Sequence, residues 1–229
     1  MKYWRCVFIL CVLGMTALLA QYQNQSQSSP VPTLSFDLYW EAATPQNYTI
    51  TVDALGAAHY VSRNPTRAAA GAEPDDPEYD LHFTISGPSR DRIFNLAQEL
   101  NYFQGQFDYK QHRIANTGAK TLHYQDATRD NSTTYNWSEN KSIQELTRLF
   151  QGISNTLQFG EKLKFKKRFD KLGLEKELKG MEDLAQNQDL AELQIIAPVL
   201  QNIADDTSVL HVARERARRL LAQAGPSKD

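Results

Sequence analysis

Residues 34–62 read LSFDLYWEAATPQNYTITVDALGAAHYVS, and apolar side chains recur at alternate positions over most of this stretch. Phe36, Leu38 and Trp40 alternate with more polar neighbours, and residues 48–52 repeat the pattern. Neighbouring side chains leave opposite faces of a β-strand, so this period predicts strands with one buried face. We therefore expect the folded part of the chain to begin as a half-buried sheet.

The predicted sheet continues after this stretch. A turn at residues 55–56 leads into residues 58–62, which predicts a hairpin. Residues 64–77 contain three prolines and predict a long exposed loop. Alternation returns in three later segments, so we expect an antiparallel sheet of about five strands. These later segments are residues 80–85, 120–125 and 133–137.

One helix is predicted to pack on this sheet. Ser86-Gly87-Pro88 is typical of a strand exit and a helix start. Apolar residues then recur at helical spacing up to Phe103, and Gly105 is expected to close the helix.

The chain from residue 140 onward is predicted to be helical. Ser142 and Glu145 have the spacing of a capping box, and an apolar stripe follows as far as Leu157. The fold class is therefore α+β, a sheet domain at residues 34–139 followed by a helical region at residues 140–224. Three further helices are expected at residues 173–185, at residues 193–203 with a kink or restart at Pro198, and after an N-cap cluster at residues 205–207, before a tail at residues 225–229.

The N-terminus has the pattern of an export signal. Lys2 and Arg5 precede residues 6–20, which contain no charge. This run of 15 residues is shorter than the roughly 20 needed to span a bilayer, so a cleaved signal is favoured over a short anchor. The following residues, 21–33, are rich in Gln and Ser and are expected to form a disordered tether.

Composition narrows the function classes. Both cysteines lie in the apolar run, so a cleaved chain could form no disulfide, and export without disulfides favours a bacterial periplasmic or secreted protein. The net charge of −2 argues against a nucleic-acid partner. Five N-x-[ST] triplets would indicate glycosylated loops only if the source were eukaryotic. No phosphate-loop, dinucleotide or esterase motif occurs, and no cofactor is expected.

Five segments of the sheet region and the first helices form a recognisable pattern: TITVDALGAAHY, DLHFTIS, RIFNLAQELNYF, GAKTLHYQ and TTYNWS. With this pattern the chain resembles, over roughly residues 48–153, a family of exported bacterial domains of unknown function. The resemblance rests on patterning rather than on a reactive motif, and it implies an exported location and a fold but no activity.

Three residues on the predicted polar face of the sheet are candidates for metal ligands. Asp80 and His82 lie two apart on one strand, and His123 lies on another. Adjacent strands could bring the three together around a metal ion. The simpler interpretation is that these residues are only the solvated face of a half-buried sheet.

A serine enzyme is a weaker hypothesis. Ser138 and Lys141 match the S-x-x-K motif of penicillin-recognising enzymes, but the other motifs of that class are missing. Ser138 is more simply a residue at a helix entry.

The strongest run of charge is a basic segment at residues 162–171, in which lysines and an arginine are interleaved with phenylalanines. The simpler interpretation buries Phe165 and Phe169 in the helical core and leaves the lysines in water; the alternative is contact with an anionic membrane surface. The candidate surface-binding residues are Lys162, Lys164, Lys166, Lys167, Arg168 and Lys171.

Taken together, these patterns predict an exported, non-catalytic interaction module of the cell envelope that binds a protein partner. The alternative is a small metal-binding protein or hydrolase that uses the polar sheet face around Asp80, His82 and His123.

Overall fold

The computed structural model describes residues 30–64 and 78–225. The predicted signal or anchor lies outside these residues, as do most of the tether, most of the proline-rich loop and all but the first residue of the tail. The described residues from Val31 onward belong to one compact unit.

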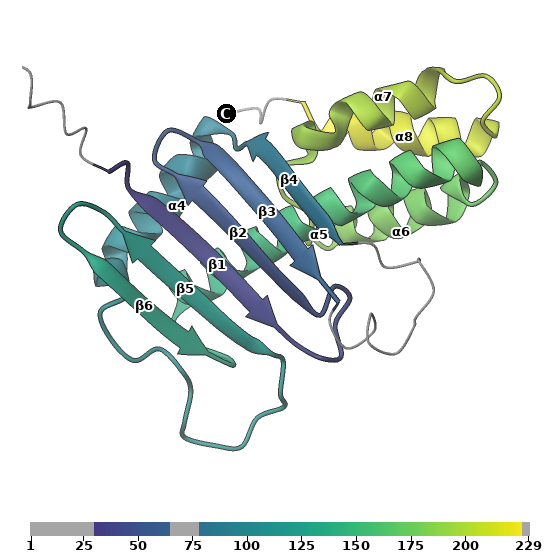
Figure 1. Ribbon diagram of the computed structural model, residues 1–229. Helices are drawn as coiled ribbons and strands as arrows, with labels where there is room; N and C mark the ends of the chain where they lie inside the picture. Colours follow the sequence, from purple (N-terminus) through teal and green to yellow (C-terminus); the bar gives the residue numbers. More distant parts are fainter. Residues whose placement is uncertain (1–29, 65–77, 226–229) are drawn as a thin grey trace, which may run out of the picture. The chain divides into compact units, whose positions relative to one another are not determined.

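Within the described residues, six strands form one antiparallel sheet in the order β4-β3-β2-β1-β5-β6 (Figure 1). β1 pairs with β2 on one side and with β5 on the other. The predicted α+β class, with an antiparallel sheet and a helical C-terminal region, is confirmed. The strands are β1 Thr33–Tyr39, β2 Asn47–Asp53, β3 Ala57–Arg63, β4 Tyr79–Thr84, β5 Ala119–Gln125 and β6 Asp130–Tyr135.

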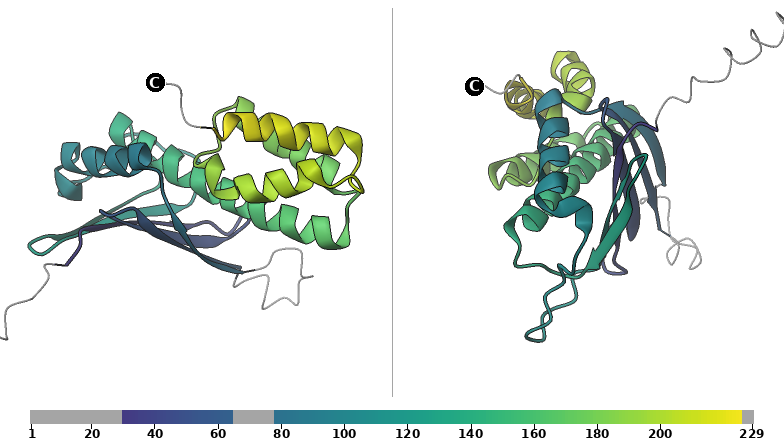
Figure 2. Two further views of the ribbon diagram at one scale, coloured as in Figure 1. Left: turned by 90° about the horizontal axis from the view of Figure 1, so that it is seen from above. Right: turned by 90° about the vertical axis from the view of Figure 1, so that its left-hand side faces the viewer.

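One face of the sheet is buried and the other is open. Leu34, Phe36 and Leu38 of β1 are buried and alternate with half-buried neighbours, as expected, and Ile50 and Leu122 on the flanking strands are also buried. The helices lie on one side of the sheet in both views of Figure 2, so the alternation separates a core face from a polar face.

Helix α4, Gly87–Glu99, begins where the sequence predicts. The Ser86 side chain accepts a hydrogen bond from the Ser89 backbone N–H, and Pro88 stands in the first turn. The helix ends at Glu99 rather than near Gly105, and a 3₁₀ turn, η1 Asn101–Phe103, follows it with left-handed φ angles. This change of direction brings Phe103 into the core, so the apolar spacing was correct although the helix end was wrong.

Helix α5, Lys141–Phe169, does not use the predicted capping box. The side chain of Asn140 caps it by accepting from the backbone N–H groups of Ser142 and Ile143. Glu145 instead forms a bidentate ion pair with Arg92 on α4. A tertiary partner thus takes the carboxylate that the local motif would have used.

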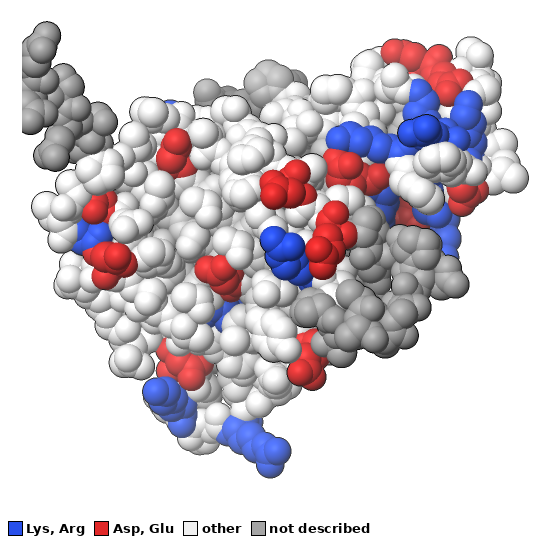
Figure 3. Space-filling view, in the orientation of Figure 1, with Lys and Arg blue, Asp and Glu red and all other residues white. Residues whose placement is uncertain are grey.

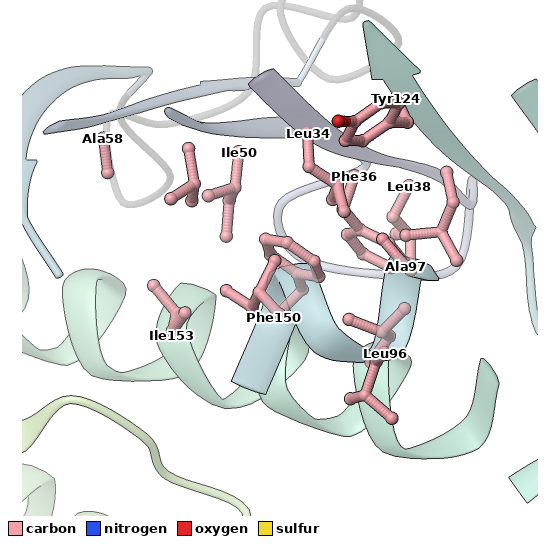
Figure 4. Close-up of a cluster of buried hydrophobic side chains, with 14 of the residues drawn as sticks. Leu34, Phe36, Leu38, Ile50, Ala58, Leu96, Ala97, Tyr124, Phe150 and Ile153 are labelled. Carbon is pink, nitrogen blue, oxygen red and sulfur yellow. The ribbon is translucent and has the colours of Figure 1, made fainter. Parts of the chain in front are cut away.

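Helix α5 belongs to two cores. Its first half packs on the sheet beside α4, where the Phe150 ring stacks on Phe36 at 5.2 Å between centroids (Figure 4). Its second half supplies Leu163 to a separate core among the C-terminal helices. The sequence predicted one helix on the sheet, whereas two helices, α4 and the first half of α5, pack on it. The apolar stripe of α5 runs without a break from the sheet core into the helical core, so the stripe alone does not show where the helix leaves the sheet.

The remaining helices pack around the second half of α5. The predicted kink or restart at Pro198 corresponds to a 3₁₀ turn followed by a helix that begins one residue earlier, at Ala197. The cluster at residues 205–207 does not cap the last helix, which begins at His211 with Leu210 at its cap. The elements are α6 Leu174–Gln186, η2 Leu193–Ile196, α7 Ala197–Asp205 and α8 His211–Gln223.

A carboxylate joins the sheet layer to the helical region. Glu192, which precedes η2 with φ 58° and is almost fully buried, lies at the N-terminus of α4. Its oxygens accept from the Ser86 backbone N–H at 2.6 Å, the Ser86 hydroxyl at 2.7 Å and the Ser89 hydroxyl at 2.6 Å. A negative charge at a helix N-terminus also interacts favourably with the helix dipole.

Candidate functional site

The basic segment, residues 162–171, covers the last turns of α5 and the two residues after it, and most of its lysines are held in ion pairs. Lys166 bonds Asp170 at 3.2 Å, and Lys164 bonds Glu161 at 2.5 Å. Two of the predicted surface-binding residues therefore meet acids on their own helix or at its end, and they are not free cations.

Two further lysines of the segment reach the turn between α7 and α8. Lys171 Nζ lies 3.2 Å from Asp206 Oδ2 and also bonds the Ser208 hydroxyl, and Lys167 Nζ lies 3.8 Å from the same Asp206 oxygen. These contacts fasten the end of α5 to the neighbouring helices, so part of the charge run has a structural role.

Phe165 and Phe169 are exposed, at 58% and 63%, so the prediction that they are buried in the helical core was wrong. The side of α5 that faces the other helices carries Leu163, followed by Lys166 and Lys167. The Lys166 ammonium lies 3.9 Å from Glu177 Oε1 on α6, and that of Lys167 reaches the acid in the α7–α8 turn. The phenylalanines consequently lie on the outward side of the helix.

We define the tip patch as Phe165, Phe169 and Leu172. The two rings touch at 5.0 Å between centroids, and Leu172 is 74% exposed. The Arg168 guanidinium lies 4.9 Å from the centroid of the Phe169 ring, a cation–π contact. Lys162 and Arg168 have no ion pair among the residues that the structure describes.

Charged and uncharged surface alternate at this end of the protein. Figure 3 shows Lys and Arg side chains gathered around uncharged surface at the end where α5 finishes, with Asp and Glu at the margins. Leu210, the last residue of the α7–α8 turn, and Val212, in the first turn of α8, are each 45% exposed, and Figure 1 places that turn at the same end.

Hydrogen bonds from Ser208 and Lys171 hold the pKa of Asp206 well below its usual value. A group with a depressed pKa stabilises the folded state above its unfolded pKa, and this contribution is lost as the pH falls. We therefore expect Asp206→Asn to lower the melting temperature at neutral pH, with a difference from the unmodified protein that shrinks as the pH falls from about 5 to about 2. Melting curves across this range, with Asp205→Asn as the control, would check it; a constant difference would contradict it.

The open face of the sheet carries a cluster that only partly matches the predicted metal ligands. His59 on β3 stands opposite His82 on β4, and their rings stack at 4.2 Å between centroids. Asp80 Oδ1 lies 2.7 Å from His59 Nε2 and 4.0 Å from His82 Nε2. The hydrogen bond from His59 lowers the pKa of Asp80. One ligand atom from each residue lies within 4.8 Å of the others.

His123 is not part of this cluster. It lies on β5, and β1, β2 and β3 stand between β5 and β4. Its partner is Asp130 on β6, at 2.6 Å from Nε2 to Oδ1. The predicted trio of Asp80, His82 and His123 is therefore not brought together, whereas His59, which has no partner nearby in sequence, completes the cluster.

Ser138 and Lys141 do not form a catalytic pair in the structure. Ser138 is buried, and its hydroxyl accepts from the Asn140 backbone N–H at 3.2 Å while its carbonyl accepts from Gln144 at 2.8 Å. These bonds shape the entry to α5, in agreement with the simpler interpretation of Ser138.

A groove lined by both polar and apolar side chains lies between the end of the sheet and α5. Two adjoining cavities of ≈ 440 Å³ and ≈ 300 Å³ share Trp40, Arg148, Gln151 and Asp189 in their linings. Among the described residues that line them there is no histidine or cysteine, and Asp189 is the single carboxylate. The groove could hold a small polar ligand but offers no evident pair of groups for acid–base or nucleophilic chemistry.

Lys120 lines this groove, but its ammonium group is hydrogen-bonded to backbone carbonyls. The Lys120 ammonium donates to the carbonyl oxygens of Thr117, Gly118 and Asn136, at 2.9, 3.2 and 2.9 Å. Its burial lowers its pKa. Lys120 thus links the backbone at the start of β5 to the backbone after β6, and its ammonium group is not available to an anionic ligand.

No helix among the described residues is both long and apolar enough to cross a membrane. Comparison with models of protein families and with curated proteins finds no match to the chain. The resemblance to exported bacterial domains therefore stays a prediction.

Proposed function

We propose that this protein is a non-catalytic module of the cell envelope that docks on an anionic membrane surface through the tip patch. The observation that supports the proposal is the exposure of two touching phenylalanines and a leucine beside cationic side chains at one end of the protein. Large aromatic side chains on a cationic surface are typical of segments that lie at a lipid interface.

The energetics favour insertion of this patch into an apolar layer. Complete burial of a Phe or Leu side chain is worth about 1.5–3 kcal/mol, and the tip patch leaves more than half of each of its three side chains in water. Each basic residue near an anionic leaflet adds about 1 kcal/mol. Lys162 and Arg168 can contribute this amount without breaking an ion pair that the structure describes.

Charge complementarity favours anionic lipid as the occupant. Residues 161–172 contain six cationic and two acidic side chains, although the whole chain has a net charge of −2. The positive charge is therefore local and surrounds apolar groups, which suits a surface that is anionic outside and apolar within.

The N-terminal sequence agrees with this location. An export signal or short anchor at residues 6–20, followed by a tether, would deliver the folded part to the envelope or hold it close to a membrane. Where residues 6–20 are retained as an anchor, the tether raises the local concentration of lipid, so even a weak surface contact at the tip would be populated.

The test is sedimentation of the purified protein with vesicles of phosphatidylglycerol and phosphatidylcholine. We expect Phe165→Ser/Phe169→Ser to bind these vesicles at least about tenfold more weakly than the unmodified protein, because two inserted rings are lost. Binding of the unmodified protein should fade as salt is added. The double variant should remain folded, since changes at exposed positions usually stay within about 0.5 kcal/mol.

Leu55→Ser is the matched control. Leu55 is 74% exposed, like Leu172, but lies in the β2–β3 turn on the sheet. Leu172→Ser should weaken lipid binding and Leu55→Ser should leave it unchanged. Equal binding by all variants would overturn the proposal, as would capture of a protein partner by the tip patch without any salt-sensitive lipid binding.

A further inference from the structure

We propose that His59, Asp80 and His82 form a site for a divalent transition-metal ion of the zinc class on the open face of the sheet. This site is independent of the tip patch, because it lies on β3 and β4 while the tip patch lies at the end of α5.

The antiparallel register of β3 and β4 creates the cluster. His59 pairs directly with His82, and Asp80 precedes His82 by two residues, so all three side chains leave the same face of the sheet. The face is open, with His59 half-buried and Asp80 and His82 exposed. An ion could therefore reach the three ligand atoms from solvent.

The spacing of the ligand atoms is close to that of a metal site. Metal–ligand bonds of about 2.0–2.2 Å in tetrahedral geometry place neighbouring ligand atoms about 3.3–3.6 Å apart. The distances from Asp80 Oδ1 to the two Nε2 atoms, 2.7 and 4.0 Å, lie on either side of this value. Small rotations of exposed side chains are enough to equalise them.

The ligand set selects the class of ion. Two imidazoles and one carboxylate suit Zn²⁺, Cu²⁺, Ni²⁺ or Fe²⁺ and are poor ligands for Mg²⁺ and Ca²⁺, which prefer oxygen atoms. Three protein ligands on an open face leave coordination positions for water or for a group from another molecule.

The same sheet contains a natural control for this cluster. His123 on β5 bonds Asp130 on β6 at 2.6 Å, just as His59 bonds Asp80 at 2.7 Å. The residue opposite His123 on β6 is Ser132, two positions after Asp130, where the candidate site has His82. The two clusters have the same register and differ in this second histidine.

The experiment is titration of the purified protein, without a histidine tag, with Zn²⁺ by isothermal calorimetry. We expect one equivalent to bind, and we expect His59→Ala and His82→Ala each to weaken binding by at least about tenfold. His123→Ala should leave the affinity unchanged. Circular dichroism would confirm that each variant is folded, as expected for changes at partly or fully exposed positions.

A second experiment moves the site from β3 and β4 to β5 and β6. Because it tests for a gain of Zn²⁺ binding, a loss of folding cannot produce the expected result. In the His82→Ala background, Ser132→His should restore one equivalent of Zn²⁺ by completing the cluster around His123 and Asp130. The proposal would be overturned if the unmodified protein bound no Zn²⁺. It would also be overturned if His123→Ala weakened binding as much as His82→Ala, which is the result expected for adventitious binding to scattered surface histidines.

Discussion

Phe150→Ala is expected to lower the free energy of unfolding by about 3–5 kcal/mol, the usual cost of emptying a buried aromatic site. The Phe150 side chain is fully buried and stacks on Phe36 in the middle of the sheet, so its removal leaves a cavity between α5 and β1 (Figure 4). Urea denaturation would measure the change in the free energy of unfolding.

The matched control is Phe165→Ala on the same helix. It removes the same side chain from a position that is 58% exposed, so it should cost no more than about 0.5 kcal/mol. A similar loss of stability in the two variants would mean that both halves of α5 are buried alike, which would contradict the arrangement described above.

Glu192→Ala is expected to lower the free energy of unfolding by about 2–4 kcal/mol, because buried hydrogen bonds to a charged group are costly to lose. The variant leaves the Ser86 N–H and the hydroxyls of Ser86 and Ser89 without their carboxylate partner at the start of α4. Ser86 can still cap α4, so the loss should come from the link between the two layers.

Two substitutions separate this effect from a general loss of charge. Glu192→Gln keeps one acceptor oxygen and should cost less than Glu192→Ala. Glu145→Ala removes an exposed ion pair with Arg92 and should cost no more than about 1 kcal/mol. If Glu145→Ala and Glu192→Ala destabilised the protein equally, burial of Glu192 would not be the cause.

Local sequence patterns predicted most elements of the fold. The alternation at Phe36 and Leu38 identified β1 and its buried face, and Ser86 with Pro88 identified the start of α4. Such signals depend on neighbours within a few residues, where the period of the side chains follows directly from backbone geometry.

The candidate metal cluster could not be predicted in this way. His59 and His82 are separated by a loop most of which lies outside the described residues, so no count along the chain shows that they pair. Strand order then removes His123 from the cluster, since three strands lie between β4 and β5. Register and strand order are properties of the folded sheet, and the polar alternation of a single strand is compatible with many of them.

The sequence by itself determined that residues 34–62 and the later alternating segments form a half-buried sheet and that the chain after residue 140 is helical. It could not decide which side of the end of α5 is buried, because basic side chains occur all around the helix there and apolar side chains lie on more than one side. Only the tertiary structure decided this: acids on α6 and in the α7–α8 turn bind Lys166 and Lys167, and Phe165 is left in water. Helical periodicity specifies which residues share a face, whereas the packing partners determine which face turns inward.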